Sequence, residues 1–246
     1  DFTRARLGRA LLAEADFRGA SLREVDLSGA LLYAARLVGA DLGQADLGEA
    51  DLSRARCLGA YMAGVKARQA SFTEARLVRA VLDGADLSRA DLTGADLSDA
   101  RLEGATLEEA RLRDVYARGA HFKRAFLRGA DLDNAMLGGT LLSDADLLEA
   151  SLEGANLIGA VAVVTDFTRA RMDGIRARGA HLRGSRFNRA RLAGARFVDS
   201  DLRGAQFEGA DLSNADLTRA RLEGARFEGA DTEGVNFEGS DAAADA

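Results

Sequence analysis

The chain has 246 residues, and its 39 acidic and 33 basic side chains leave a formal net charge of −6, which excludes the strongly basic footprint of a nucleic-acid-binding protein. Cys57 is the only cysteine, which excludes an intrachain disulfide framework and a cysteine-based zinc site. No run approaches the roughly 18 apolar residues of a membrane span. Neither a secretory signal nor an initiating Met is visible, so by default we expect a cytoplasmic location and a segment of a longer protein.

A five-residue repeat runs from Asp1 to Ser240 without an insertion and gives 48 pentapeptides. The second residue of each repeat, its centre, is Leu or Phe almost throughout, and the fifth is Ala in 38 of the 48 repeats. This spacing fits neither the 3.6-residue period of a helix nor the two-residue period of a strand. It suits a chain that turns a corner once per repeat. The last six residues, 241–246, form a short polar tail.

The fourth position of the repeat holds 23 of the 27 glycines, which indicates a positive φ there, as in a type II turn. Four corners close a square coil of 20 residues, so the 48 repeats predict 12 coils. With adjacent coils about 4.8 Å apart, the rod is roughly 55–60 Å long. The first position favours Asp, whose side chain can bond backbone groups of the turn.

The repeat centre is reduced to alanine at four places along the chain. At three of them a larger side chain two residues earlier restores the lost volume: Val65 before Ala67, Val115 before Ala117 and Ile175 before Ala177. Ala162 has no such partner, because Ala160 precedes it. We therefore expect a local void or an inward bend at Ala162.

Two stretches carry consecutive copies of one motif: ADLSRADLTGADLSDA at 85–100 and ADLSNADLTRARLEGARFEGA at 210–230. They resemble the A(D/N)LXX motif of the pentapeptide-repeat family, and the resemblance covers nearly the whole chain. It implies an all-β fold, a right-handed quadrilateral β-helix over residues 1–240. In that fold the Leu or Phe centre and the preceding small residue point inward. The resemblance implies much less about function.

Few residues are suited to catalysis. His121 and His181 occupy solvent-facing first positions three coils apart, about 14 Å along the axis, so they cannot share a metal. Cys57 sits at a repeat centre as an apolar filler, with no basic partner to activate it. No phosphate-loop, dinucleotide-binding or zinc-protease motif occurs. We expect no catalytic residue, no metal site and no cofactor, and hence not an enzyme.

Residues 20 apart lie on one side of the rod, which defines four faces. We name them the first to fourth faces, after the repeats that begin at Asp1, Arg6, Leu11 and Asp16. Their summed charges are 0, −1, −7 and +4. The third face is therefore acidic, and its candidate residues are Asp91, Asp131, Asp133, Glu153, Asp211 and Asp231.

Some members of the resembled family imitate duplex DNA, and these proteins inhibit DNA gyrase or protect it from quinolones. The acidic face therefore implies an alternative function, a DNA-mimicking gyrase inhibitor or protection protein. Five arginines interrupt the acidic row: Arg54, Arg111, Arg113, Arg171 and Arg191. No loop breaks the repeats, although some family members use such loops to engage the enzyme.

A second candidate surface is apolar. Large apolar residues occupy solvent-facing first positions within about three coils: Tyr116, Phe126, Met136, Leu141 and Val161. On the basic fourth face, three more stack just after the centre in consecutive coils: Val38, Leu58 and Val78. Contiguous apolar surface on a soluble protein usually marks an interface, so a docking site or a dimer contact is predicted.

These features favour a rigid, non-catalytic protein-interaction module within a larger bacterial protein. The expected partner is a protein, which would be DNA gyrase under the alternative function, with no direct binding of nucleic acid and no membrane span. A solenoid exposes unpaired strand edges at its termini. We therefore expect a homodimer or flanking domains to cap the rod ends.

Overall fold

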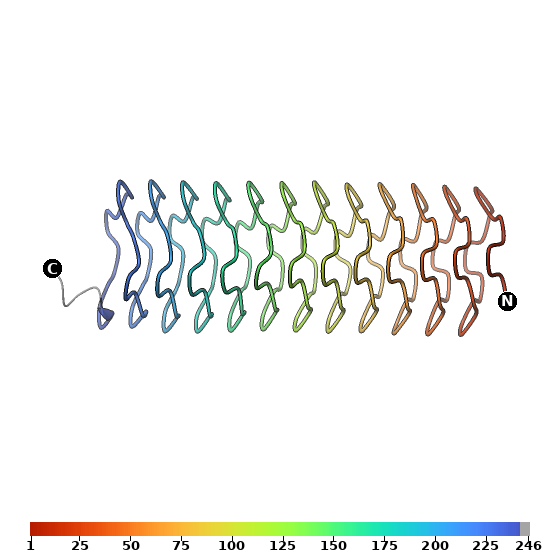
Figure 1. Ribbon diagram of the computed structural model, residues 1–246, viewed down its shortest axis with the longest axis horizontal. Helices are drawn as coiled ribbons and strands as arrows, with labels where there is room; N and C mark the ends of the chain where they lie inside the picture. The colour runs from red at the N-terminus through yellow and green to blue at the C-terminus, as the bar shows by residue number, and fades with distance from the viewer. Residues whose placement is uncertain (242–246) are drawn as a thin grey trace.

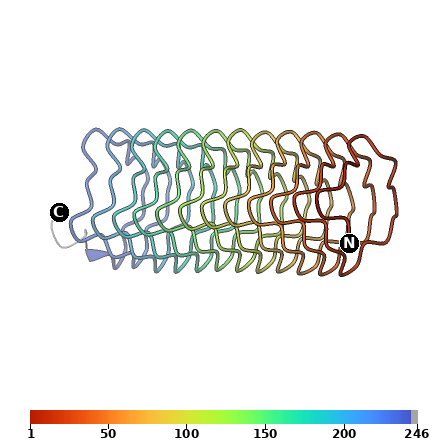
Figure 2. The same cartoon turned by 45° about the vertical axis from the view of Figure 1, so that its right-hand side comes forward.

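The coils of this chain stack into one straight rod, with the first and last coils at opposite ends (Figures 1 and 2). The computed structural model describes residues 1–241. The first residue of each repeat forms a parallel bridge with the residue 20 positions later, from Arg6 with Asp26 to Asp216 with Asn236. Residues 1–240 contain no helix, and no strand longer than one bridging residue. The predicted all-β coil of four pentapeptides is confirmed.

Main-chain hydrogen bonds tie each coil to both neighbours. The Leu7 N–H donates to the Asp26 carbonyl of the next coil (2.7 Å), and the Asp26 N–H donates back to the Ala5 carbonyl (3.0 Å). The Ala10 N–H closes the turn on the Leu7 carbonyl (3.0 Å). With small variations this scheme repeats along the rod, and it leaves one amide per repeat, at the third position, without a main-chain acceptor.

Asp at the first position supplies the missing acceptor. The Ser28 N–H, for example, donates to Asp26 Oδ1 (3.0 Å). All 16 aspartates and both asparagines at first positions in residues 1–240 accept this bond from the third residue. Where Arg101 stands first, the amide two residues on bonds Asp83 of the previous coil instead (2.9 Å). The recurrence of Asp thus follows from backbone satisfaction, as predicted.

The fourth position of every repeat lies in the left-handed region. All 48 of these residues have φ between +53° and +71°, and 25 of them are not glycine. The predicted positive φ at the fourth position is confirmed, and the turn also accepts Arg, Glu, Asp and Asn there. Val164 is the one β-branched residue among them, with φ +56°.

The interior holds the centres and the fifth residues in one continuous column. Val65, Val115 and Ile175, predicted to fill the space left by alanine centres, are completely buried. The turn-closing hydrogen bond at each of them is 3.3 Å, against 3.0 Å at Ala10. A larger fifth residue is therefore accommodated by a slightly wider turn.

Phenylalanines stack in the second half of the core. The rings of Phe167, Phe187, Phe207 and Phe227 lie one coil apart, with centroids 4.9–5.1 Å apart and planes within 4–7° of parallel. Phe197 packs edge-on against this stack. The exact 20-residue period brings these rings into register.

The repeat around Ala162, where the sequence predicts a void or an inward bend, differs from the other repeats in its turn. The Thr165 N–H does not close its turn on the Ala162 carbonyl and donates instead to Ser185 Oγ (3.2 Å). The Ser185 hydroxyl in turn donates to the Ala162 carbonyl. The Ala162 N–H keeps its bond to the next coil (2.8 Å), and Ala162 stays buried. The departure is therefore an opened turn that a buried hydroxyl bridges.

The repeats continue through Ser240, the predicted end of the β-helix. Of the predicted tail 241–246, residues 242–246 lie outside the described residues. The Asp241 carboxylate accepts hydrogen bonds from the N–H groups of Leu222 and Glu223. At Leu222 it thereby takes the place that a main-chain carbonyl of the next coil has elsewhere in the rod.

Candidate interaction face

The acidic third face is largely a row of ion pairs. Four of its six candidate carboxylates lie within ion-pair distance of an arginine one coil away: Asp91 with Arg111, Asp131 and Asp133 with Arg113, and Glu153 with Arg171. Asp133 is also buried, and its Oδ1 accepts the N–H of Glu153 (3.0 Å). The arginines of this face therefore occupy positions at which a partner's cations would have to bind.

Asp211 and Asp231 are the two candidates with no ion-pair partner within residues 1–241. They bridge each other in consecutive coils, and each accepts the N–H of the residue two positions later (3.0 Å). Hydrogen bonds from the side chain and the N–H of Ser213 hold the pKa of Asp211 below its usual value. Both carboxylates remain accessible to solvent.

The five candidate apolar residues are distributed over three faces. Tyr116 and Met136 bridge each other on the fourth face, whereas Leu141 and Val161 bridge each other on the first. Phe126 lies alone on the second face, between polar bridge partners. The structure thus brings together two pairs, and the pair on the fourth face is the more exposed.

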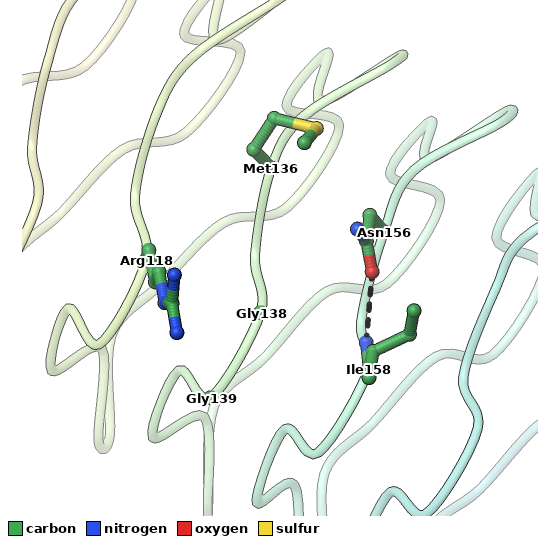
Figure 3. Close-up of a pocket in the computed structure, with 6 residues that line it drawn as sticks. All are labelled: Arg118, Met136, Gly138, Gly139, Asn156 and Ile158. Carbon is green, nitrogen blue, oxygen red and sulfur yellow. Dashed lines mark hydrogen bonds between the residues drawn. The ribbon is translucent and has the colours of Figure 1, made fainter.

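A pocket of about 380 Å³ opens beside Met136 on the fourth face (Figure 3). Its lining consists of Arg118, Met136, Gly138, Gly139, Asn156 and Ile158. Gly138 stands at the third position, where the preceding coil carries Arg118 and the following coil Ile158. The missing side chain leaves a notch between these two, because a Cβ on Gly138 would meet only the Ile158 carbonyl oxygen, at 3.7 Å.

The side chains around the notch are exposed. Met136 is 40% and Ile158 45% exposed, and Tyr116, the bridge partner of Met136 in the preceding coil, is 56% exposed. The Asn156 side-chain oxygen accepts the N–H of Ile158 (3.0 Å), drawn dashed in Figure 3, and so holds the turn that presents this side chain. The notch is therefore a preformed apolar depression with one cation, Arg118, at its edge.

The sequence analysis identified Met136 but missed the rest of this pocket. Residues 138–139 form the only Gly-Gly pair in the chain, which is the signal that was available. Gly139 occupies the ordinary turn position, whereas Gly138 removes a side chain from an exposed column. Only the stacking of coils shows that this gap lies between Arg118 and Ile158.

The same face carries three arginines in consecutive coils, which we call the arginine ladder: Arg36, Arg56 and Arg76. All three are exposed, and none has an acidic side chain within 4 Å in the described part of the chain. Beside the ladder runs the predicted aliphatic stack, which we call the aliphatic edge: Val38, Leu58 and Val78. A groove of about 220 Å³ lies between ladder and edge, lined by Arg56, Arg76 and the three aliphatic residues.

The model of the family described as pentapeptide repeats matches this chain in eight copies, which together span residues 1–243. This chain belongs to the pentapeptide repeat family. Its four-sided coil is accordingly the right-handed quadrilateral β-helix of that family. No curated protein matches the chain.

Several solved structures of pentapeptide repeat proteins are similar to this chain. HetL, a pentapeptide repeat protein involved in heterocyst differentiation regulation in the cyanobacterium Nostoc, is 31% identical, with a TM-score of 0.54. That match covers 83% of this chain and 87% of HetL. A thylakoid-lumen pentapeptide repeat protein of Arabidopsis thaliana is 31% identical over 43% of this chain and 67% of its own, with a TM-score of 0.32. Full-length QnrB1, a plasmid-mediated fluoroquinolone resistance protein, is 18% identical over 74% of this chain and 87% of its own, with a TM-score of 0.25.

The side chains considered for catalysis or metal binding lie apart from one another in the described part of this pentapeptide repeat protein. His121 and His181 are exposed on the first face, with Leu141 and Val161 in the two coils between them. Cys57 is completely buried, and the loss of hydration raises the pKa of its thiol to about 12. Within residues 1–241 no three His, Cys, Asp or Glu side chains are grouped so as to hold a metal ion. No helix in the same range is long and apolar enough to cross a membrane.

Proposed function

We propose that this pentapeptide repeat protein is a non-catalytic interaction module whose fourth face binds another protein. The notch at Gly138 carries the proposal, because it is a preformed apolar depression beside the exposed side chains of Met136 and Ile158. Tyr, Met and Arg are enriched at protein interfaces, and the notch and its rim present Tyr116, Met136 and Arg118. A side chain of the partner that enters the notch would bury Met136 and Ile158.

The rigidity of the rod supports this function. Every coil is hydrogen-bonded to its neighbours, so the walls of the notch are held by main-chain bonds before a partner arrives. A preformed site avoids much of the ordering entropy that binding otherwise costs. The buried, weakly acidic thiol of Cys57 and the separated histidines favour binding over catalysis.

A photo-crosslinking residue at the third position of each face tests which face binds. One coil supplies four matched sites, one on each face: Ser143, Leu148, Glu153 and Ile158. Each variant is exposed to light in a lysate of the source cells, and the adducts are identified by mass spectrometry. We expect one specific adduct from position 158, because it lines the notch. Equal adducts from all four positions would contradict the proposal.

Reconstitution with the purified adduct partner completes the test. Met136→Asp and Ile158→Asp each place a carboxylate in the notch, and we expect each to weaken binding at least tenfold, as loss of a central contact does. Leu148→Asp on the second face is the matched control and leaves binding unchanged. Unchanged affinity in both notch variants would overturn the assignment of the face.

DNA mimicry on the third face is a second candidate. The unpaired carboxylates of Asp211 and Asp231 favour it, whereas the arginine pairs of the other four candidates weigh against it. A DNA gyrase supercoiling assay, with and without a quinolone, tests it directly. If mimicry operates, the wild-type protein alters supercoiling, and Asp211→Asn with Asp231→Asn removes the effect while keeping both turn bonds. No effect of the wild-type protein in either condition excludes gyrase as the target.

A further inference from the structure

We infer that the arginine ladder and the aliphatic edge together bind an acidic, extended segment of a partner polypeptide. The inference rests on the proposed function, since it concerns the same fourth face, and it gives the chemistry that the partner must have. Three observations carry it: uncompensated charge, an apolar groove beside that charge, and the charge pattern along the rest of the face.

The arginine ladder lacks the neutralisation found elsewhere on the rod. Arginines at the fourth position of the repeat typically pair with an acidic residue one coil away, as Arg54 does with Glu74 (2.8 Å) and Arg89 with Glu109 (2.9 Å). Arg56 instead has Arg36 on one side and Arg76 on the other. Like charges directly opposite each other on neighbouring strands are destabilising. The ladder therefore carries a cost that a carboxylate-bearing ligand would remove.

The acidic residues in the coils directly before and after the ladder form no ion pair with its arginines. Asp16, one coil before it, is held by Arg18 at 2.6 Å. Asp96, one coil after it, accepts the N–H of Ser98 (3.0 Å), and no arginine comes within ion-pair distance of it. The three guanidinium groups thus stay available for bidentate bonds to carboxylates, the strongest hydrogen bonds that they form.

The aliphatic edge determines what else the ligand must offer. Leu58 is 46% exposed and forms the groove wall with Val38 and Val78. Three coils at about 4.8 Å span roughly 10 Å, the length of three or four extended residues. A segment that lies along the rod axis with alternating acidic and apolar side chains meets the arginines on one side and Leu58 on the other.

A nucleic acid fits these residues less well. Single-stranded nucleic acids bind by stacking their bases on aromatic side chains, and this groove offers only aliphatic ones.

A second copy of this chain is disfavoured as well. The other half of the fourth face carries Arg176 and Arg196, bridged to each other and also without an acidic neighbour within 4 Å in residues 1–241. If two copies met through their fourth faces with their rods parallel, the arginine ladder of one copy would lie against the ladder of the other. An antiparallel contact sets it against Arg176 and Arg196. Both arrangements bring like charges together, so a different, acidic chain is the better occupant.

Fluorescence anisotropy with defined probes tests the inference. The probes are a labelled nine-residue peptide of alternating Glu and Val, its Lys-Val counterpart, its Glu-Ser counterpart and a nine-nucleotide oligothymidine. We expect the Glu-Val peptide to bind most tightly and the Lys-Val peptide not to bind. Replacing the three ladder arginines with Gln should weaken Glu-Val binding at least tenfold, and Leu58→Ser should weaken it several-fold.

A matched variant separates local recognition from net charge. Arg89→Gln, Arg169→Gln and Arg219→Gln together also remove three positive charges, but from fourth positions of the repeat at which each arginine is ion-paired. We expect this triple variant to leave the affinity unchanged. Thermal unfolding provides a second readout. The melting temperature of the ladder variant should be no lower than that of the wild type, because the repulsion between like charges is gone. If the arginines served only to stabilise the fold, the variant would melt at a lower temperature.

Several outcomes overturn the inference. They are wild-type affinity in the ladder variant, equal loss in both triple variants, equally tight binding of the Glu-Ser peptide, and tighter binding of the oligothymidine. A dimer in sedimentation that the ladder variant abolishes would identify a second copy as the occupant. If adducts still form at Ile158 while the ladder variant binds normally, this inference fails and the proposed function stands.

Discussion

At the level of single residues, the repeat 161–165 holds the one β-branched side chain among the residues with a positive φ. Val164 adopts φ +56°, a conformation that β-branched side chains rarely take, and its own turn is opened by the Ser185 hydroxyl. Its side chain is 57% exposed, so little packing compensates the strain. This is the repeat that also lacks a bulky centre.

Val164→Gly is therefore expected to stabilise the protein by about 1 kcal/mol, because glycine adopts a positive φ without steric cost. Urea unfolding followed by circular dichroism measures the change. Gly184→Val, at the same position one coil later with φ +67°, is the matched control. A Cβ there meets Val164 Cγ2 at an ordinary 3.6 Å, so its expected destabilisation reports backbone strain alone. A less stable Val164→Gly would contradict this account.

The Asp201 carboxylate links stability to pH. Arg203 donates from Nε to Oδ1 (2.8 Å) and from Nη2 to Oδ2 (2.6 Å), and these bonds lower the pKa of Asp201 to about 2. Because the pKa is lower in the folded state, the contribution is present above pH 4 and is lost as the pH falls toward 2.

Asp201→Asn is expected to cost about 1–2 kcal/mol of unfolding free energy at pH 7 and almost nothing at pH 2. Urea titrations at the two pH values measure the difference. Asp146→Asn removes a first-position carboxylate that bonds only the Leu148 N–H, so its cost at pH 7 should be smaller. A pH-independent cost for Asp201→Asn would show that the arginine pair does not contribute.

The coil is the structural element of this protein, and its exact period sets how side chains stack. Phe187 illustrates this, since its ring lies 5.1 Å from Phe167 and 4.9 Å from Phe207, with Phe197 edge-on at 6.0 Å. Offset and edge-on rings contribute beyond the area that they bury. The second half of the rod is therefore held by aromatic stacking as well as by leucine packing.

Phe187→Ala is expected to destabilise the protein by about 3–5 kcal/mol, the usual cost of removing a buried phenyl ring. Phe187→Leu introduces the other common centre of the repeat and should cost only about 1 kcal/mol. Thermal and urea unfolding compare the two variants. Equal losses would mean that the stacked rings matter no more than any apolar centre.

In the whole molecule, the number of residues between two positions determines whether they lie on the same face of the rod. Residues that differ by multiples of 20 share a face, so Leu58 and Ile158 lie five coils apart on the fourth face, about 24 Å along the axis. Each repeat stacks only on its neighbours, so extra repeats change the order of the faces without disrupting the core.

Inserting one copy of Asp86–Ala90 after Ala90 is expected to leave the fold intact and to rotate all later repeats by one face. Spin labels at Leu58→Cys and Ile158→Cys then lie on different faces, and electron–electron resonance should show a longer distance. Cys57 does not interfere, because it is completely buried. Inserting a whole coil of 20 residues keeps both labels on one face and adds only about 4.8 Å. An unchanged distance after the five-residue insertion would refute the four-sided coil.

The sequence alone determined the fold, because the strict five-residue period gives every residue one place in the coil. It predicted the 20-residue coil, the positive φ at the fourth residue and the volume exchange between Val65 and Ala67. Each of these is a local consequence of one repeat and its immediate neighbour. The way the Ser185 hydroxyl bridges the opened turn depends on a neighbouring coil, 23 residues away, and was not predictable from the repeat alone.

The tertiary structure decided how the surface side chains are grouped. Carboxylates such as Asp91 form an acidic row in the sequence, but stacking places Arg111 beside that group. Gly138 is a small residue in the sequence and becomes a notch only between Arg118 and Ile158. Arg36, Arg56 and Arg76 are ordinary surface residues until the coils align them without an acid. Composition and period fix what lies inside the rod, because packing there is local, whereas surface charge and shape depend on side chains brought together from different coils.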